Sequence, residues 1–330
     1  MGFYRNRTIA AVAALSALLL SGCRAGTDQP VLTKTAVALN TTVVLSIYDD
    51  GADEDLLEDC MRDITRYENL FSRTLPGSDI SRINAAGGEW VTVSSDTLAL
   101  IRESVRVSKR SGGAFDITVE PLSSLWNFTE DHPQAPTDAA IADAAGHIGY
   151  ERIQIQGDRV RLADPEAGID VGGAAKGYIA DQLKNYLEEN GVKSALINLG
   201  GNVLAIGEKN GGDFSIGIRD PAGEDNLAAT VRVQNRSVVT SGSYERGFTQ
   251  DGVWYHHILD PSTGRPVDNG LASVTILSEH SVLGDMLSTA CFVLGREKGM
   301  QLIEDIPEAE ALFIDTQGGQ YRSSGFPQAS

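Results

Sequence analysis

Cysteine is scarce in this 330-residue chain, which contains only three. Cys23 closes an apolar N-terminal run, whereas Cys60 and Cys291 lie on the apolar stripes of two expected helices. So few cysteines exclude a framework of disulfide bonds, and their spacing gives no zinc site built from thiolates. We therefore expect Cys60 and Cys291 to be two separate buried thiols.

Basic residues are also in short supply. Lysine and arginine number 27 against 45 aspartates and glutamates, which gives a net charge of −18 at neutral pH. A surface this acidic repels polyphosphate and argues against nucleic acid as a partner. An anionic ligand would need locally placed cations or a metal ion.

Long hydrophobic runs are absent as well. The N-terminal run over residues 9–20 follows Arg5 and Arg7 and is too short for a comfortable membrane span, so it is typical of a secretory signal. It ends in Leu20-Ser21-Gly22-Cys23, which resembles a bacterial lipobox. An ordinary signal followed by a chance cysteine is the alternative interpretation.

The lipobox resemblance divides the N-terminal region into two parts. It implies a signal peptide over residues 1–22, acylation of Cys23, and a lipidated tether over residues 23–33. The mature protein would then be anchored by lipid to a bacterial membrane and face the periplasm or the cell exterior.

The remaining chain shows strand and helix patterns in mixed order. Apolar alternation predicts strands that include 34–39, 42–48, 194–198, 254–259 and 272–277, and helical spacing predicts helices that include 54–71, 95–109, 174–189 and 281–294. Because the two types do not strictly alternate, we expect an α+β fold with mixed, mostly antiparallel sheets and packed helices. No compositional break follows residue 33, so residues 34–330 are interpreted as one domain.

The stretch from Ile169 to Tyr178 combines a strand end, two glycines and the start of a helix. Glycine permits positive φ, so Gly172 and Gly173 favour a sharp turn. Free N–H groups at the helix start, with Lys176 in its first turn, suit a phosphate. A tight turn without a ligand is the alternative.

Asp285 and Thr289 lie four residues apart on the helix predicted over 281–294, so their oxygens project from one face. A carboxylate and a hydroxyl are hard ligands that suit Mg²⁺. The alternative is a solvated aspartate with a threonine bonded back to its own helix.

The adjacent His256 and His257 cannot converge on one ion from a strand, because neighbours point to opposite faces. One of them, beside the turn that follows Asp260, is a candidate general base. The small hydroxyls of the Ser241-Gly242-Ser243 stretch are either phosphate contacts or part of a connecting loop. After the 95–109 helix, residues 111–116 either bring backbone close to a flat or charged ligand or form a helix cap before a buried strand.

Taken together and in this order, these motifs resemble the ApbE family of FAD:protein FMN transferases. The resemblance is carried by seven segments: residues 78–84 (SDISRIN), 112–116 (GGAFD), 170–177 (DVGGAAKG), 198–202 (NLGGN), 241–242 (SG), 257–264 (HILDPSTG) and 285–290 (DMLSTA). It implies an FAD cleft between two intimate subdomains.

Position by position, the resemblance implies metal ligation by the Asp285 carboxylate, the Thr289 hydroxyl and the Gly173 carbonyl. It also implies FAD contacts from residues spread along the chain: Leu39, Thr74, Ala114, Phe115, Asp116, Asp170, Lys176, Ile258, Leu259 and Ser288. Thr74 departs from the family pattern, in which many members have tyrosine, and this puts in doubt how firmly FAD is held against hydrolysis.

The implied activity is Mg²⁺-dependent transfer of FMN from FAD to a threonine or serine hydroxyl of a target protein, with release of AMP. Family targets are extracytoplasmic flavin acceptors such as subunits of membrane redox complexes. Cleavage of a phosphoanhydride needs neutralised oxygens and an in-line hydroxyl, which agrees with a metal at Asp285. We predict that Asp285 and His257 are catalytic, with His257 as the base.

Two other functions compete with this interpretation. In an Mg²⁺-dependent FAD pyrophosphatase, water would replace the target hydroxyl and give free FMN and AMP. A non-catalytic FAD-binding lipoprotein would retain FAD without releasing AMP. A generic two-lobed solute receptor fits less well, because it would show stricter alternation of strands and helices.

Overall fold

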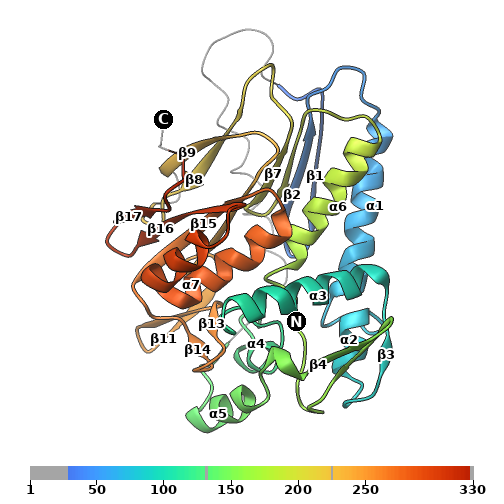
Figure 1. Cartoon of the computed structure of the whole chain (residues 1–330). Coiled ribbons are helices and arrows are strands. Elements are labelled where there is room, and N and C mark those ends of the chain that lie inside the picture. The colour runs from blue at the N-terminus through green and yellow to red at the C-terminus, as the bar shows by residue number, and fades with distance from the viewer. Residues whose placement is uncertain (1–28, 131–132, 224–225, 328–330) are drawn as a thin grey trace, which may run out of the picture.

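The computed structural model describes residues 29–130, 133–223 and 226–327. A single antiparallel sheet forms the centre of the molecule (Figure 1). Its eight strands run in the order β1 (Leu32–Ala38), β2 (Thr41–Ile47), β6 (Ala195–Leu199), β7 (Asn202–Ile206), β10 (Ser237–Gly242), β15 (Leu271–Ser278), β16 (Ala309–Asp315) and β17 (Gln320–Arg322).

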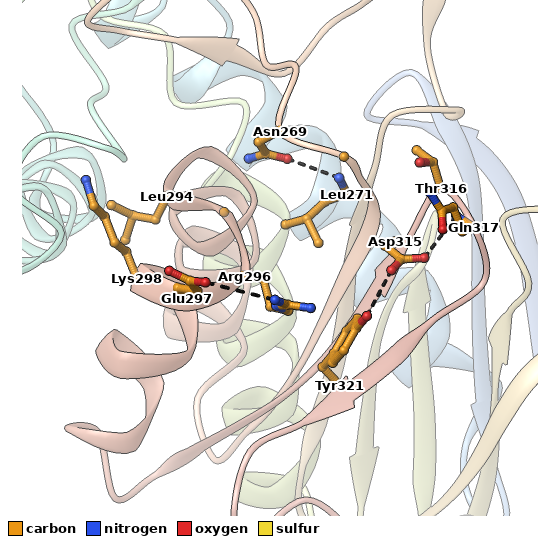
Figure 2. A pocket seen from close by; sticks show the side chains of 12 residues that line it. Asn269, Leu271, Leu294, Arg296, Glu297, Lys298, Asp315, Thr316, Gln317 and Tyr321 are labelled. Carbon is orange, nitrogen blue, oxygen red and sulfur yellow. Dashed lines mark hydrogen bonds and ion pairs between the residues drawn. The ribbon is translucent and has the colours of Figure 1, made fainter.

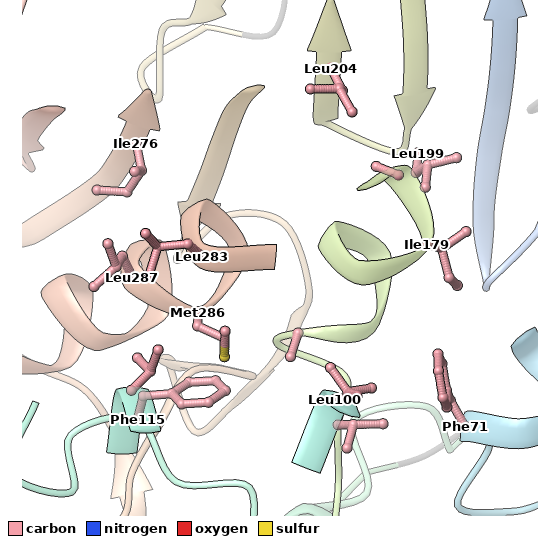
Figure 3. Close-up of a cluster of buried hydrophobic side chains, with 14 of the residues drawn as sticks. Phe71, Leu100, Phe115, Ile179, Leu199, Leu204, Ile276, Leu283, Met286 and Leu287 are labelled. Atoms are coloured by element: carbon pink, nitrogen blue, oxygen red, sulfur yellow. The ribbon is translucent and has the colours of Figure 1, made fainter. Parts of the chain in front are cut away.

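Helices cover one face of this sheet, where the main apolar core lies. They are α1 (Glu54–Phe71), α6 (Ala175–Glu189) and α7 (Ser281–Glu304), with α3 (Ser95–Arg110) packed against α7. Figure 3 shows how strand residues such as Ile276 and Leu204 face helix residues such as Leu283, Leu287 and Ile179. This packing fixes α7 against β10 and β15 and α6 against α7.

The opposite face of the sheet is covered by a β-hairpin. Its strands are β8 (Phe214–Arg219) and β9 (Leu227–Val233). Phe214 and Val231 from this hairpin pack with Val238, Leu277 and Leu312 from the sheet in a second core. Both faces of the sheet are therefore covered around its central strands, which explains why β15 is buried at every position.

The remaining elements lie at one end of the helical layer. A small sheet joins β3 (Val91–Thr92), β5 (Arg159–Leu162) and β4 (Ile153–Gln156), near α2 (Asp79–Asn84) and the 3₁₀ turn η1 (Tyr150–Arg152). A third apolar cluster joins α4 (Glu120–Trp126) and α5 (Asp138–Gly146) to the hairpin of β13 (Leu259–Asp260) and β14 (Arg265–Pro266). The last hairpin pairs β11 (Gly247–Gln250) with β12 (Val253–His256).

The α+β, mostly antiparallel fold expected from the sequence is confirmed, but several elements differ. The strand predicted over 254–259 is interrupted, because β12 ends at His256 and β13 begins at Leu259. The helix predicted to end at 294 continues to Glu304 across a kink at Gly295, which has φ of 77°. The buried strand considered as one alternative after the helix cap at residues 111–116 is wrong, since a turn leads into α4 there.

The chain start and the cysteines test two further predictions. β1 begins at Leu32, two residues inside the tether predicted over 23–33, whereas the signal peptide and Cys23 lie outside the described residues. Cys60 and Cys291 are free and buried, as predicted, and burial raises the pKa of Cys60 to about 12. Within the described ranges, no helix has the length and apolarity to cross a bilayer.

Candidate functional site

The glycine turn before α6 is built by close approach rather than by unusual φ. Neither Gly172 nor Gly173 has positive φ, so the prediction that these glycines serve to permit positive φ is wrong. Space is the reason at Gly173, where an added Cβ would lie 3.3 Å from the Phe115 ring and 3.4 Å from Thr289 Oγ1. The turn therefore brings its backbone directly against α7 and the Phe115 loop.

The first turn of α6 is fastened to the start of α7. A Cβ on Gly177 would lie 2.4 Å from the Ser281 carbonyl oxygen, so only glycine fits this contact. Asp181 accepts hydrogen bonds from the N–H groups of Ser281 at 2.8 Å and Val282 at 2.9 Å. The Asp181 carboxylate, which belongs to α6, thus caps the N-terminus of α7 and fixes the angle between the two helices.

Asp285 lies inside this junction and is only 5% exposed. Its Oδ2 accepts a 2.8 Å hydrogen bond from the Gly177 N–H, and it forms no salt bridge with any described residue. Burial raises the pKa of Asp285, and the charge of Lys176 opposes this rise from nearby. A buried carboxylate without a paired cation is a fitting ligand for a metal ion.

Thr289 lies one turn further along α7 and is not bonded back to its helix. The Asp285 carbonyl, which such a bond would use, accepts instead from Ser288 Oγ at 2.8 Å. The Thr289 hydroxyl contacts Ser241 Oγ at 3.4 Å. The alternative of a solvated aspartate with a back-bonded threonine is therefore wrong.

The three predicted metal ligands are thus brought together by the fold. Asp285 and Thr289 share one face of α7, and the Gly173 backbone lies against Thr289. Among the described residues, no group of three or more His, Cys, Asp or Glu side chains is placed to hold a metal. A site here must therefore use few side chains, which suits Mg²⁺ because this ion keeps water and phosphate oxygens as ligands.

The two histidines have different roles, which the sequence left open. His256 is buried, its Nε2 contacts the Val267 carbonyl at 2.8 Å, and its ring meets Phe292 edge to face. His257 Nδ1 contacts the Arg246 carbonyl at 3.2 Å. Because a carbonyl only accepts, Nδ1 carries the proton and Nε2 is left with a free lone pair.

His257 lies near the charge of Lys176 as well. Burial lowers the pKa of His257 to about 4, helped by the nearby charges of Arg246 and Lys176 and opposed by the hydrogen bond to the Arg246 carbonyl. The imidazole is therefore neutral at physiological pH. Since Lys176 acts on both His257 and Asp285, these three side chains belong to one region.

The loop before α4 meets this region from the other side. Phe115 is buried, and Figure 3 shows its ring directly below Met286 of α7. Asp116 braces the loop, because its carboxylate accepts from Thr118 N–H at 2.8 Å and from Tyr150 N–H at 2.8 Å. Both side chains are occupied within the protein, so FAD contacts from them and from the neighbouring Ala114 stay predictions.

Other predicted FAD residues are more scattered. Ile258 belongs to the main core and Leu259 to the third cluster, so their side chains pack inside the protein. Thr74 is exposed and its hydroxyl contacts Ser72 Oγ at 3.2 Å. Leu39 lies in a turn with φ of 53°. No contact given by the structure joins Leu39 or Thr74 to the region of Asp285, and their assignment stays a prediction.

Sequence reasoning missed several side chains of this region. Arg73 pairs with Asp170 at 3.3 Å, which the strand-end position of Asp170 did not reveal. Asn202 is 1% exposed and lies close enough to Asp285 to lower its pKa, while its Nδ2 has no hydrogen-bond partner in the described chain. The available signal for Asn202 was its place at the end of the NLGGN motif, to which the sequence alone assigns no role in the site.

A cavity of about 490 Å³ lies elsewhere, between the second half of α7 and the β15–β17 edge (Figure 2). Among its polar lining groups, Asp315 accepts a hydrogen bond from Tyr321, and the Arg296 guanidinium lies 4.3 Å from the Tyr321 ring centroid. None of the predicted site residues lines it. This cavity is separate from the Asp285 region.

Comparisons with known proteins identify the family of the chain. Residues 39–313 match the ApbE family. The chain is 38% identical over 291 residues to a FAD:protein FMN transferase of Klebsiella pneumoniae (strain 342), with 87% of this chain and 90% of that protein covered. It is 36% identical over 276 residues to one of Treponema pallidum (strain Nichols), with 78% and 76% covered.

Solved structures give the same result. The ApbE protein of Thermotoga maritima superposes with a TM-score of 0.83 at 34% identity, covering 89% of this chain and 97% of that one. The flavin transferase ApbE of Vibrio cholerae gives 0.79 at 30% identity, with 89% and 97% covered. By sequence and by fold, the chain belongs to the ApbE family.

Proposed function

We propose that the protein is an FAD:protein FMN transferase, which moves FMN from FAD to a serine or threonine hydroxyl of a target protein and releases AMP. The names of its relatives support FMN transfer. The observation that carries the proposal here is the convergence of Asp285, Thr289 and Gly173 beside Lys176 and His257. Such a grouping supplies a cation site, a fixed charge and a base in one place.

Mg²⁺ fits the donor set at the junction of α6 and α7. The Asp285 carboxylate, the Thr289 hydroxyl and the Gly173 carbonyl would hold it, and the buried, unpaired carboxylate is the observation that favours a cation. When bound, Mg²⁺ would neutralise diphosphate oxygens. The protein's own residues supply positioning: Lys176 adds a charge for the diphosphate, and the Gly177 N–H fixes one carboxylate oxygen of Asp285.

In the proposed reaction, the acceptor oxygen attacks the phosphorus of the FMN phosphoryl group. The bond from that phosphorus to the bridging oxygen breaks, and AMP leaves with the bridging oxygen. His257 Nε2, which has a free lone pair, takes the proton of the attacking hydroxyl. No covalent intermediate on the enzyme is required.

The proposed targets are extracytoplasmic flavin acceptors, reached from a lipid anchor at Cys23. This localisation rests on the sequence pattern of residues 9–23 alone. Replacing Cys23 with serine would release the protein from the membrane fraction. Continued membrane association of Cys23→Ser would remove the anchor from the proposal.

Mass spectrometry of an acceptor domain incubated with FAD, Mg²⁺ and the protein tests the proposal. We expect the domain to gain the mass of one FMN group while AMP appears in equal amount. The matched control is Asp285→Asn, which should leave the domain unmodified. An unmodified domain beside accumulating free FMN would establish the pyrophosphatase, and retained FAD without AMP would establish a binding protein.

The pyrophosphatase is kept as a second candidate because of one position. Thr74 is exposed and its hydroxyl reaches only Ser72, so no aromatic ring covers a ligand there. A Thr74→Tyr variant should then lower the ratio of free FMN to protein-bound FMN. An unchanged ratio would show that position 74 does not control access of water.

A further inference from the structure

We infer that Ser241 is a positioning residue for the cation site: it fixes the direction in which the Thr289 hydroxyl presents its oxygen. The inference rests on the proposed function in that it takes the Thr289 oxygen as a ligand of a divalent cation. Ser241 lies at the end of β10, outside the helix that carries Asp285 and Thr289. It is connected to that helix through two hydroxyl groups.

The connected hydroxyls form a chain with only one possible direction. Ser288 Oγ donates to the Asp285 carbonyl at 2.8 Å, and a carbonyl can only accept. Having used its single proton, Ser288 must accept from Ser241, 2.8 Å away. Ser241 has then used its own proton, so at its 3.4 Å contact with Thr289 it must accept.

The consequence for Thr289 is that its proton points toward β10. Among the described residues, Ser241 is the sole hydrogen-bond partner of the Thr289 hydroxyl. With the proton directed there, the lone pairs of Thr289 Oγ1 point elsewhere and are free to bind a cation. A metal ligand whose hydrogen is held by an outer partner binds more tightly than one that must first reorient.

The strand that carries Ser241 is firmly held against α7. Ser237, on the same face of β10, contacts Ser281 Oγ at 2.9 Å, and Val239 between them lies against Gly284. Ser281 in turn donates to Asn202 Oδ1 at 2.7 Å, which leaves the Asn202 amide nitrogen as the group near Asp285. Residues on one face of β10 thus orient the side chains that surround both proposed side-chain ligands, Asp285 and Thr289.

The opposite face of β10 offers a matched control. Thr240 is adjacent to Ser241 in the sequence but pairs its hydroxyl with Thr275 at 2.8 Å, away from α7. Thr240→Ala and Ser241→Ala each remove one hydroxyl and one 2.8 Å hydroxyl pair from the same strand. Only Ser241→Ala breaks the chain that leads to Thr289.

Calorimetric titration of MgCl₂ into the full-length, flavin-free protein, and again with ADP present, tests the inference. We expect Ser241→Ala to weaken Mg²⁺ binding about 10- to 100-fold, the range found for outer partners of metal ligands. Thr240→Ala should match the wild type, and Ser241→Thr, which keeps a hydroxyl, should restore most of the affinity. Equal Mg²⁺ affinity in wild type and Ser241→Ala, or no binding by the wild type under either condition, would overturn the inference.

Steady-state kinetics separate positioning from a general structural effect. In Ser241→Ala the Mg²⁺ concentration for half-maximal FMN transfer should rise, while kcat at saturating Mg²⁺ changes far less, because Thr289 itself is intact. A loss of kcat with no change in Mg²⁺ dependence would contradict positioning. If the wild type transfers no FMN but the calorimetric difference holds, the proposed reaction is wrong and the role of Ser241 stands.

Discussion

The carboxylate of Asp285 accepts a 2.8 Å hydrogen bond from the backbone N–H of Gly177, although the two residues are 108 positions apart in sequence. The N–H belongs to the first turn of α6, where it has no partner within its own helix. The bond therefore joins the glycine turn to the helix that carries the proposed metal ligands. Any change in the spacing of α6 and α7 must alter the position of Asp285.

The spacing depends on the missing side chain of Gly177. In Gly177→Ala the new methyl group would lie 2.4 Å from the Ser281 carbonyl oxygen and 2.6 Å from Val282 Cα, which are backbone atoms that cannot rotate away. The gain of about 1 kcal/mol in helix propensity is smaller than the usual cost of overpacking. We expect a net loss of about 1–2 kcal/mol in the free energy of unfolding, measured by urea denaturation, and a loss of transfer activity.

Gly146 provides the control for this substitution. It ends α5, and nothing lies within 4 Å of a Cβ placed there. Gly146→Ala should leave stability unchanged or raise it by up to about 1 kcal/mol. Similar behaviour of the two variants would show that the contact between α6 and α7 is looser than the structure indicates.

Asp285→Asn should separate metal binding from folding. The amide keeps an oxygen for the Gly177 N–H, while the charge that suits a cation is removed. Wild-type protein at a Mg²⁺ concentration 100 times Kd should gain about 2.7 kcal/mol in stability, and the variant should gain almost none. Thermal unfolding with and without Mg²⁺ measures both, and an equal gain in the variant would exclude Asp285 as a ligand.

A second prediction concerns the relative stability of wild type and Asp285→Asn when no metal is bound. Burial raises the pKa of Asp285 above its usual range, so the folded state binds its proton more tightly than the unfolded state does. Stability from this group is present at low pH and is lost as pH rises through the raised pKa. At neutral pH and without metal, Asp285→Asn should therefore unfold at a temperature equal to or above that of the wild type.

The pH at which FMN transfer falls off on the acid side should report the pKa of His257. Because burial and nearby cations lower its pKa to about 4, the free enzyme holds a neutral imidazole well below the usual His pKa of 6.5. In a pH profile of kcat/KM, which reports the free enzyme, the His257 limb should lie near pH 4 rather than near 6.5. His257→Gln should lose about 10²- to 10⁴-fold in kcat. A His257 limb near pH 6.5 would contradict the burial argument.

The sequence predicted the helices of this fold better than the site that they form. Local spacing places Asp285 and Thr289 on one helix face, and this was enough to predict a shared ligand pair. The asparagine at 202 and the serine at 241 are brought to α7 by strand pairing within the central sheet, which no local pattern encodes. Hydrogen-bond directions around Thr289 likewise depend on two elements, β10 and α7, that are far apart in the sequence.

The errors in the element predictions have equally local causes. Val119 and Glu120-Pro121 read as the end of a strand, yet proline fits the first turn of a helix and α4 begins there. Trp254–Leu259 alternates well enough to predict one strand, but His256 Nδ1 accepts the Ile258 N–H and interrupts it. The helix was predicted to end at residue 294, but the φ of 77° at Gly295 only kinks α7, which continues beyond it.

The SDISRIN motif contributes to stability through Asp79, which is 5% exposed. Burial opposes ionisation of this carboxyl, but the Ser94 N–H at 2.8 Å and the Thr97 hydroxyl at 2.7 Å outweigh it, so its pKa is lowered. Because the pKa of Asp79 is lower in the folded state, its charge stabilises the fold fully at pH values above 3.8, the pKa in the unfolded chain. This stabilisation is lost as the pH falls through the pKa of the folded state. Asp79→Asn, which cannot ionise, should cost about 1–3 kcal/mol at pH 7.

The difference between wild type and Asp79→Asn should therefore shrink as the pH falls below 3.8, because the carboxyl of the unfolded wild type then takes up a proton while that of the folded protein is still ionised. Denaturant unfolding at a series of pH values measures this difference. Asp143→Asn, at an exposed position on α5, is the matched control and should show a small, nearly constant difference. If the cost of Asp79→Asn were the same at pH 3 and pH 7, the hydrogen bonds to Asp79 would stabilise the fold by geometry alone, without help from its charge.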